Sequence, residues 1–255
     1  MDELQETQNK RQKTNTPLTT IDALEFLSTI CGALKNIKRT GWVRNQVPLP
    51  ESDADHMHRC SMMAMLVTNQ SVKPEDDYTL NNERFHPLNI DGNKLLRMAL
   101  THDLCESLAG DITPFCSAHE VSSKQDKEHA AMEQIRSVVG DPLGQELFEL
   151  WKEYEELKTP EAIYCKDIDK FEMVMQAYEY EKMHLKHKDD CDNNVDENDV
   201  CHAPMRTFFR TTNSSMKTPL FRRLDLELRM KRETMLKDKG WEVTDSEFQS
   251  YSEGN

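Results

Sequence analysis

The chain has 255 residues, and its 32 basic and 46 acidic side chains give a formal net charge of -14. This balance argues against a nucleic-acid binder, which needs lysine and arginine to neutralise backbone phosphates, although a small phosphate ester could still be held by a few local cations. The longest apolar run, residues 62–67, is far shorter than the roughly 20 residues of a membrane helix. No signal peptide is recognisable, so we expect a cytoplasmic protein, with the nucleus as the alternative compartment. The seven cysteines contain no CxxC and are expected to stay reduced.

Composition divides the chain into segments of different character. The polar ends, residues 1–19 and 241–255, have few apolar side chains to bury and are expected to be disordered. Residues 20–186 should form one all-α helical bundle. The acidic, Asn-rich stretch 187–204 is expected to be a flexible insertion, and residues 205–240 to be a helical extension that packs on the bundle.

Apolar residues recur at helical spacing along most of the chain, and β-branched alternation is rare. A first helix is expected after a Thr20 cap, and the second has a stripe of Met and Leu that should be core. The fourth begins with a capping box at Ser122 or Ser123, and the sixth begins with proline after Thr159. Loops are expected at 39–52 and 71–92, where proline and glycine gather. The predicted helices are 21–38, 52 or 53–70, 93–109, 122 or 123–139, 143–158, 160–186 and 219–239.

The stretch LTHDLCESLAGDITP, residues 100–114, places acids and an imidazole where a helix should bury leucine. Adjacent residues on a helix point about 100° apart, so His102 and Asp103 can share one metal ion only in the groove between them. Glu106 falls on the same side. One nitrogen and one carboxylate cannot complete a coordination sphere, so further ligands must come from other segments.

The candidates for these further ligands are His56, in the first turn of the second predicted helix, and Asp169 in the sixth, with Asp167 as a competitor. Two imidazoles and two carboxylates suit a first-row divalent ion that keeps positions open for water and substrate. A lone His-Asp pair is common without any metal, so the combination carries the hypothesis. A zinc cluster from the His and Cys residues of 184–202 is less favoured than a flexible loop, because its surroundings are acidic and Asn-rich.

Five ordered motifs resemble the HD-domain superfamily of metal-dependent phosphohydrolases, and most closely its eukaryotic HD-domain-containing 5'-deoxynucleotidases. They are RTGWV (39–43), DHMHR (55–59), ALTHDLCESLAGDITP (99–114), ELWKEYEE (149–156) and DKFEMVMQAYEYE (169–181). The resemblance implies that residues 20–186 are an HD domain. It also implies hydrolysis of deoxyribonucleoside 5'-monophosphates, a homodimer, and a divalent cation such as Mn, Co, Mg or Zn. The metal ligands implied by the resemblance are His56, His102, Asp103 and Asp169.

The resemblance also implies roles for four other residues. Glu106 would be the acid or base near the attacking water, Asp111 would contact the sugar, and Arg39 and Trp42 would lie near the nucleotide. Without the family, Trp42 is equally well explained as a loop tryptophan that covers the core, and Arg39 as a solvated cation. His58 replaces a residue that is often Tyr in relatives and is expected at the surface or behind the ligands. Two alternatives stay open: action on another nucleotide, and a catalytically silent HD module that binds other proteins.

Overall fold

The computed structural model describes residues 19–68, 83–191, 196, 198–244 and 247. Within these residues every regular element is a helix, and an isolated bridge joins Lys38 to Ser52, so the predicted all-α class is confirmed. No helix in the described ranges is both long enough and apolar enough to cross a membrane.

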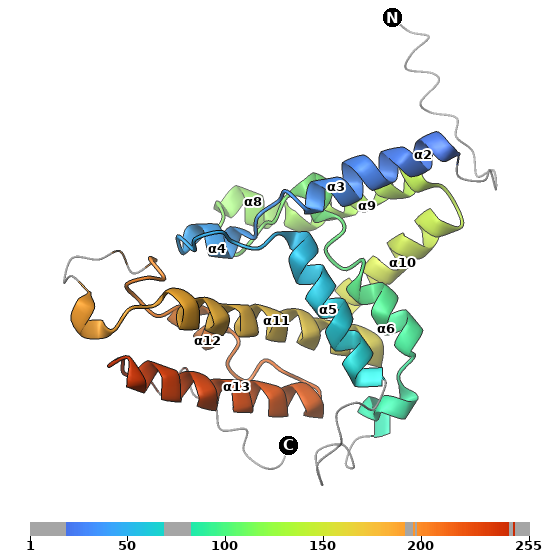
Figure 1. Cartoon of the computed structure of the whole chain (residues 1–255). Coiled ribbons are helices and arrows are strands. Elements are labelled where there is room, and N and C mark those ends of the chain that lie inside the picture. The colour runs from blue at the N-terminus through green and yellow to red at the C-terminus, as the bar shows by residue number, and fades with distance from the viewer. Residues whose placement is uncertain (1–18, 69–82, 192–195, 197, 245–246, 248–255) are drawn as a thin grey trace, which may run out of the picture.

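Helix α11, Pro160–His184, runs through the middle of the molecule (Figure 1). Helix α13, Pro219–Asp238, lies along one side of it. Helices α5, Asp53–Thr68, and α6, Gly92–Ala99, pack on α11 and on each other. The sixth and seventh predicted helices are confirmed to within two residues. The predicted end of the second helix, Gln70, lies outside the described residues.

The first predicted helix is right in position and wrong at its ends. Thr19, not Thr20, is the cap, and it forms a capping box with the first turn. Helix α2, Thr20–Glu25, continues through a π-helical segment, η1 Phe26–Ile30, into α3, Cys31–Leu34. The chain therefore leaves the helix before the expected end at residue 38.

The predicted loop 39–52 contains a short helix, α4, Thr40–Arg44, so the prediction of wholly irregular chain is wrong there. The carbonyl of Arg39 accepts hydrogen bonds from the backbone N–H groups of Trp42 and Val43, which forms the turn. Burial of the Trp42 ring then holds this turn against the core. The prolines keep the rest of the loop irregular.

The third predicted helix is interrupted. Helix α6 begins after Asp91, whose side chain accepts hydrogen bonds from the first backbone N–H groups, and it ends at Ala99. Residues 100–105 form turns, and a short α7, Glu106–Ala109, ends at Gly110 with a φ of 79°. The His-Asp pair therefore lies in a turn between two helices and not on a continuous helix.

The fourth predicted helix is confirmed, but a short helix that was not predicted precedes it. Ser117 forms the capping box, with Glu120, and begins α8, Ala118–Ser122, whereas neither predicted box at Ser122 or Ser123 caps the next helix. Helices α9, Lys124–Val139, and α10, Leu143–Glu156, then form an antiparallel pair joined at Gly140. The predicted ends of these two helices are correct to within two residues.

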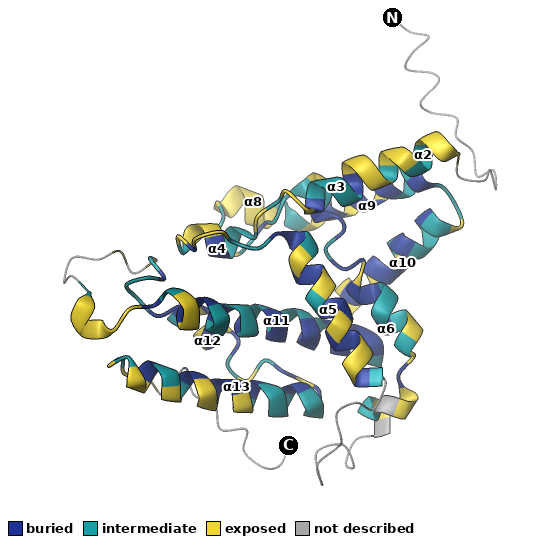
Figure 2. Cartoon of the chain, viewed as in Figure 1, coloured by how far each residue is buried: buried dark blue, intermediate teal, exposed yellow. Residues whose placement is uncertain are grey.

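Two apolar clusters form the core. One lies among α5, α6, α11, α13 and the short α12, Arg206–Thr211, and the other among α3, α7, α9 and α10. Figure 2 shows that the buried residues line the facing sides of these helices and that the outer sides of α2 and α13 are exposed. The Met and Leu stripe of α5 is only partly core, because Met62, Met65 and Leu66 are exposed. The described cysteines form no disulfide bond with one another.

Within the predicted insertion 187–204, the described residues include a 3-10 turn, η4 Lys188–Asp190, and a buried Val200. The backbone N–H of Val200 donates to the carbonyl of Asn45, near the end of α4. The C-terminal extension contacts α11 through Phe221 and Phe171, whose ring centroids are 5.5 Å apart.

Candidate metal centre

Three segments bring the four predicted metal ligands together. His56 lies in the first turn of α5, His102 and Asp103 lie in the turn after α6, and Asp169 lies in α11. One ligand atom from each residue lies within 4.8 Å of the others. Nε2 of His56 is 3.4 Å from Oδ1 of Asp169 and 3.6 Å from Oδ2 of Asp103.

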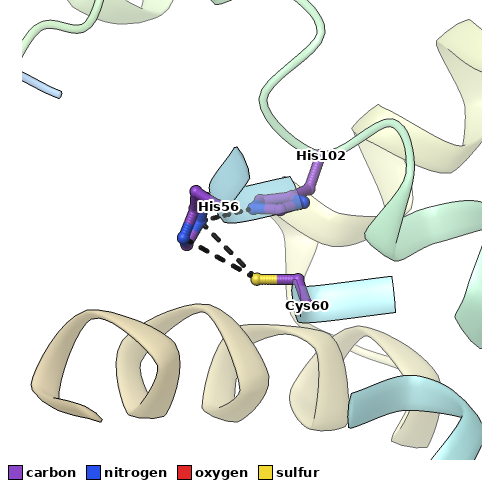
Figure 3. Close-up of side chains that lie close together, drawn as sticks. All are labelled: His56, Cys60 and His102. Atoms are coloured by element: carbon purple, nitrogen blue, oxygen red, sulfur yellow. Dashed lines mark hydrogen bonds between the residues drawn. The ribbon is translucent and has the colours of Figure 1, made fainter. Parts of the chain in front are cut away.

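The hydrogen bonds at the Nδ1 atoms of the two imidazoles turn both Nε2 atoms toward the centre of the cluster. Nδ1 of His102 donates to the carbonyl of Ala99 at 3.0 Å, and Nδ1 of His56 donates to the carboxylate of Glu172; these partners assign the tautomers. The two Nε2 atoms are only 3.3 Å apart, and Figure 3 shows the two rings meeting. Two imidazole nitrogens and two carboxylates that converge on one place fit a divalent metal ion.

The surroundings of these groups favour positive charge at the centre. Burial and Arg39 lower the pKa of His56, but negative neighbours, among them Glu172, outweigh them and hold it well above its ordinary value. Burial raises the pKa of Asp169, but Lys166 and the two histidines hold it well below its ordinary value. Asp169 is therefore ionised at neutral pH and available as a ligand.

Partners outside the cluster hold its two carboxylates. Oδ2 of Asp103 accepts a hydrogen bond from Nη1 of Arg39 at 3.0 Å. Oδ2 of Asp169 accepts from the hydroxyl of Tyr154 at 2.7 Å and from Nζ of Lys166 at 3.0 Å, which leaves Oδ1 toward His56. Such outer contacts fix the orientation of metal ligands and tune their basicity.

Glu106 lies three residues after Asp103 in the sequence. It is the first residue of α7, and its side chain is buried. Its Oε2 accepts no hydrogen bond from the described residues. Burial, Asp103 and Asp111 raise its pKa well above the usual range, so the carboxyl can hold a proton near neutral pH. A buried, unpaired carboxyl beside a ligand cluster is suited to proton transfer.

Asp53 is a second buried carboxyl that the sequence analysis missed. It is fully buried three residues before His56, and neither of its oxygens has a partner among the described residues. Burial raises its pKa to about 7. In the sequence ESDADH it resembles Asp55, which instead caps α5 with Ser52, so the sequence offers no signal that separates the two acids.

Arg39 and Asp111, two of the predicted substrate contacts, lie at the edge of the ligand cluster. Arg39 is paired with Asp103 as described above. Asp111 follows Gly110, whose positive φ lets the chain turn after α7. Oδ2 of Asp111 accepts a hydrogen bond from the backbone N–H of Thr40 at 2.6 Å, which ties the end of α7 to the start of α4.

Trp42 does not lie on the surface of the site. It is 1% exposed, and its ring centroid is 4.6 Å from that of Phe208 in the core. Its Nε1–H donates to Oε1 of Glu51 at 2.8 Å. This placement favours the alternative interpretation, a tryptophan that covers the core, over stacking on a nucleotide.

The structure separates the ligand candidates that the sequence left in competition. Asp167 faces α13, where it accepts a hydrogen bond from the backbone N–H of Thr218 at 2.6 Å, and is not part of the cluster. His58 is exposed, as expected. Among the described residues, the His and Cys side chains of 184–202 form no group that could hold a metal ion.

Cys60 is a neighbour of the cluster that no sequence motif singles out. Its Sγ is 3.6 Å from Nε2 of His56, one turn earlier on α5, and Figure 3 shows it between the histidines and α11. Burial raises the pKa of this thiol to about 11. It therefore stays protonated at neutral pH and is a poorer ligand than the carboxylates of Asp103 and Asp169.

Comparison with known proteins identifies the family of this chain. Residues 31–201 match the HD domain family. The "5'-deoxynucleotidase HDDC2" of Dictyostelium discoideum is 41% identical over 210 residues, which is 80% of this chain and 95% of that protein. The human protein of the same name is 40% identical over 165 residues, 65% of this chain and 70% of its own.

The fold is also found in solved structures. The crystal structure of the PH0347 protein from Pyrococcus horikoshii OT3 aligns with a TM-score of 0.52 and 26% identity, covering 85% of this chain and 98% of that one. The HD domain-containing protein YGK1 aligns with a TM-score of 0.52 at 23% identity and supports the fold alone. Because the family match includes every residue of the His and Asp cluster, the chain belongs to the HD-domain family.

Proposed function

We propose that this chain is a metal-dependent 5'-deoxynucleotidase that hydrolyses deoxyribonucleoside 5'-monophosphates to a deoxyribonucleoside and phosphate. The observation that carries the proposal is the cluster of four possible ligand atoms from His56, His102, Asp103 and Asp169, with both Nε2 atoms directed toward the cluster. The similarity to proteins named 5'-deoxynucleotidase supports the choice of substrate.

In this proposal the four clustered residues hold the metal ion. Their two nitrogens and two oxygens suit Mn, Co or Zn, and Mg accepts the oxygens. When bound, the ion supplies positive charge that attracts a phosphoryl oxygen and increases the acidity of water.

The protein's own groups position the substrate and move the protons. Arg39 donates one hydrogen bond to Asp103, and its remaining N–H groups can bind the phosphate. A water oxygen attacks phosphorus in line, the bond between phosphorus and the 5'-oxygen breaks, and Glu106 accepts or delivers a proton in this exchange. Asp111, which accepts a hydrogen bond from Thr40, would contact the sugar.

The direct test is phosphate release by metal-stripped protein from matched deoxyribo- and ribonucleoside 5'-monophosphates, with Mn, Co, Mg and Zn added back in turn. We expect release from the deoxy series, restored by at least one ion. Glu106→Gln should reduce the rate by about a hundredfold or more, because the proton transfer is lost while the shape is kept. Asp103→Ala should abolish metal-restored release.

His58→Gln provides the control for His56→Gln, since His58 lies two residues away on α5 and is exposed. The control should keep its metal and activity, and His56→Gln should lose both. No release from either series with any ion, or near-normal turnover by Glu106→Gln and Asp103→Ala, would overturn the proposal.

A further inference from the structure

Lys166 is a partly exposed cation at the edge of the candidate metal centre. It lies on α11, three residues before Asp169, and 35% of its side chain is exposed. Its Nζ is 3.0 Å from Oδ2 of Asp169 and 2.6 Å from the hydroxyl of Tyr154. Lys166 therefore lies beside a ligand and remains open to solvent.

The donors of this ammonium are not all used. A protonated lysine has three N–H donors, and the described residues accept two of them, at Asp169 and Tyr154. The Tyr154 hydroxyl donates its own proton to Asp169, so it accepts from Lys166 without competition. One N–H of Lys166 thus remains for an anion that approaches from the exposed side.

The charges around the candidate metal centre also balance the charge of such an anion. A divalent ion is balanced by the carboxylates of Asp103 and Asp169. The two cations paired with these carboxylates, Arg39 and Lys166, then balance the two negative charges of a phosphate dianion. Each of the two cations is paired with a different carboxylate of the cluster.

We infer that Lys166 is a second phosphate-binding residue, which together with Arg39 holds the phosphate group of the substrate against the centre. The inference rests on the proposed function for the identity of the substrate. It requires only that a phosphate binds beside Asp169. The competing explanation is that Lys166 only positions Asp169.

The test uses inorganic phosphate as the ligand, so that it does not depend on turnover. The full chain is loaded with Mn²⁺, excess ion is removed, the metal content is measured, and phosphate is titrated by calorimetry. Lys166→Met should keep its metal and bind phosphate about ten- to a hundredfold more weakly, the effect of one charge-assisted hydrogen bond. Lys166→Arg should recover part of the affinity.

Lys152→Met is the matched control, because it removes the same charge from the neighbouring helix α10, where Lys152 pairs only weakly with Glu156 at 3.8 Å. It should bind phosphate like the unchanged protein. Circular dichroism measures whether each variant is folded. If Lys166→Met does not fold, the phosphate affinity of Lys166→Arg is used for the test.

Three outcomes separate the explanations. Normal phosphate affinity in metal-loaded Lys166→Met overturns the inference. A loss of phosphate binding that follows a loss of metal, and that is reversed by excess Mn²⁺, also overturns it and makes Lys166 a positioning residue for Asp169. Weakened phosphate binding with intact metal supports it, even if the protein releases no phosphate from any deoxynucleotide, a result that would refute the proposed function alone.

Discussion

At the scale of single residues, Glu172 controls how His56 faces the candidate metal centre. Both side chains are fully buried, and one oxygen of Glu172 accepts the hydrogen bond from Nδ1 of His56. The other oxygen accepts from Nε and Nη2 of Arg59 at 2.8 and 2.6 Å. Arg59 thus holds the carboxylate, and the carboxylate holds the imidazole with its Nε2 toward the other ligands.

This chain of contacts predicts that Glu172→Gln weakens metal binding by about ten- to a hundredfold, the usual effect of removing an outer partner of a metal-binding histidine. The substitution keeps the size of the side chain but removes the charge that fixes the tautomer and pairs with Arg59. The measurement is the metal dissociation constant, obtained by competition with a chelator.

Glu179→Gln is the control for this prediction. Glu179 pairs with Nη1 of the same Arg59 at 2.6 Å, but its side chain is 39% exposed and does not contact His56. It should leave the metal dissociation constant unchanged. Equal metal affinity in both variants would show that Glu172 does not act on the centre through His56.

At the scale of elements, α11 presents two aspartates two residues apart to two different partners. Asp169 faces the ligand cluster, and buried Asp167 accepts backbone hydrogen bonds from Lys217 and Thr218 at the N-terminal end of α13. A negative charge is favourable at that end of a helix. One turn of α11 therefore holds both the centre and the C-terminal helix.

The two aspartates should consequently give opposite results when they are substituted. Asp167→Ala leaves buried donors unpaired and should lower the free energy of unfolding by about 1–3 kcal/mol, with metal content unchanged. Asp169→Asn should lose metal while it keeps the contacts with α13. Urea denaturation in a chelator, combined with metal analysis, measures both effects. Loss of metal in Asp167→Ala at full stability would contradict this division.

The same helix shows what could be predicted from the sequence. Its range followed from apolar spacing and from Thr159 and a proline at its start, because these signals are local. The break after α6 was missed, since Leu100 and Leu104 continue the helical period and the bond from His102 to the Ala99 carbonyl forms only in the packed turn. The burial of Trp42 depends on Phe208, which is distant in sequence and left no local signal.

At the scale of the whole molecule, a buried ion network connects the C-terminal segment to the bundle. Arg232 of α13 donates to Glu181 of α11 at 2.6 Å and to Glu247 at 3.0 Å, and Arg206 donates to Glu247 at 2.7 Å. Arg232, Glu181 and Glu247 are at most 2% exposed. Removing one member of such a network leaves an uncompensated buried charge, which costs about 3 kcal/mol or more.

Glu247 should therefore make stability depend on pH in the acid range. Burial raises its pKa, but the hydrogen bonds from Arg206 and Arg232 outweigh this and lower it below its ordinary value. A carboxyl with a lowered pKa in the folded state stabilises fully above its ordinary pKa, and the contribution is lost as pH falls through the lowered value. Glu247→Gln should thus be much less stable than the unchanged protein near neutral pH, with a difference that shrinks in acid.

Denaturation curves at about pH 7 and about pH 3 measure this difference, provided that both proteins are free of metal. Glu233→Gln is the control, because Glu233 forms only a surface pair with Lys237 on α13 and should change stability by less than about 0.5 kcal/mol at either pH. A stability difference for Glu247→Gln that is equal at both pH values would mean that the network acts by shape and not by charge. None of these residues belongs to the ligand cluster, so the folded Glu247→Gln variant should keep a normal metal content near neutral pH. This result would separate the anchoring of the C-terminal segment from the chemistry of the metal centre.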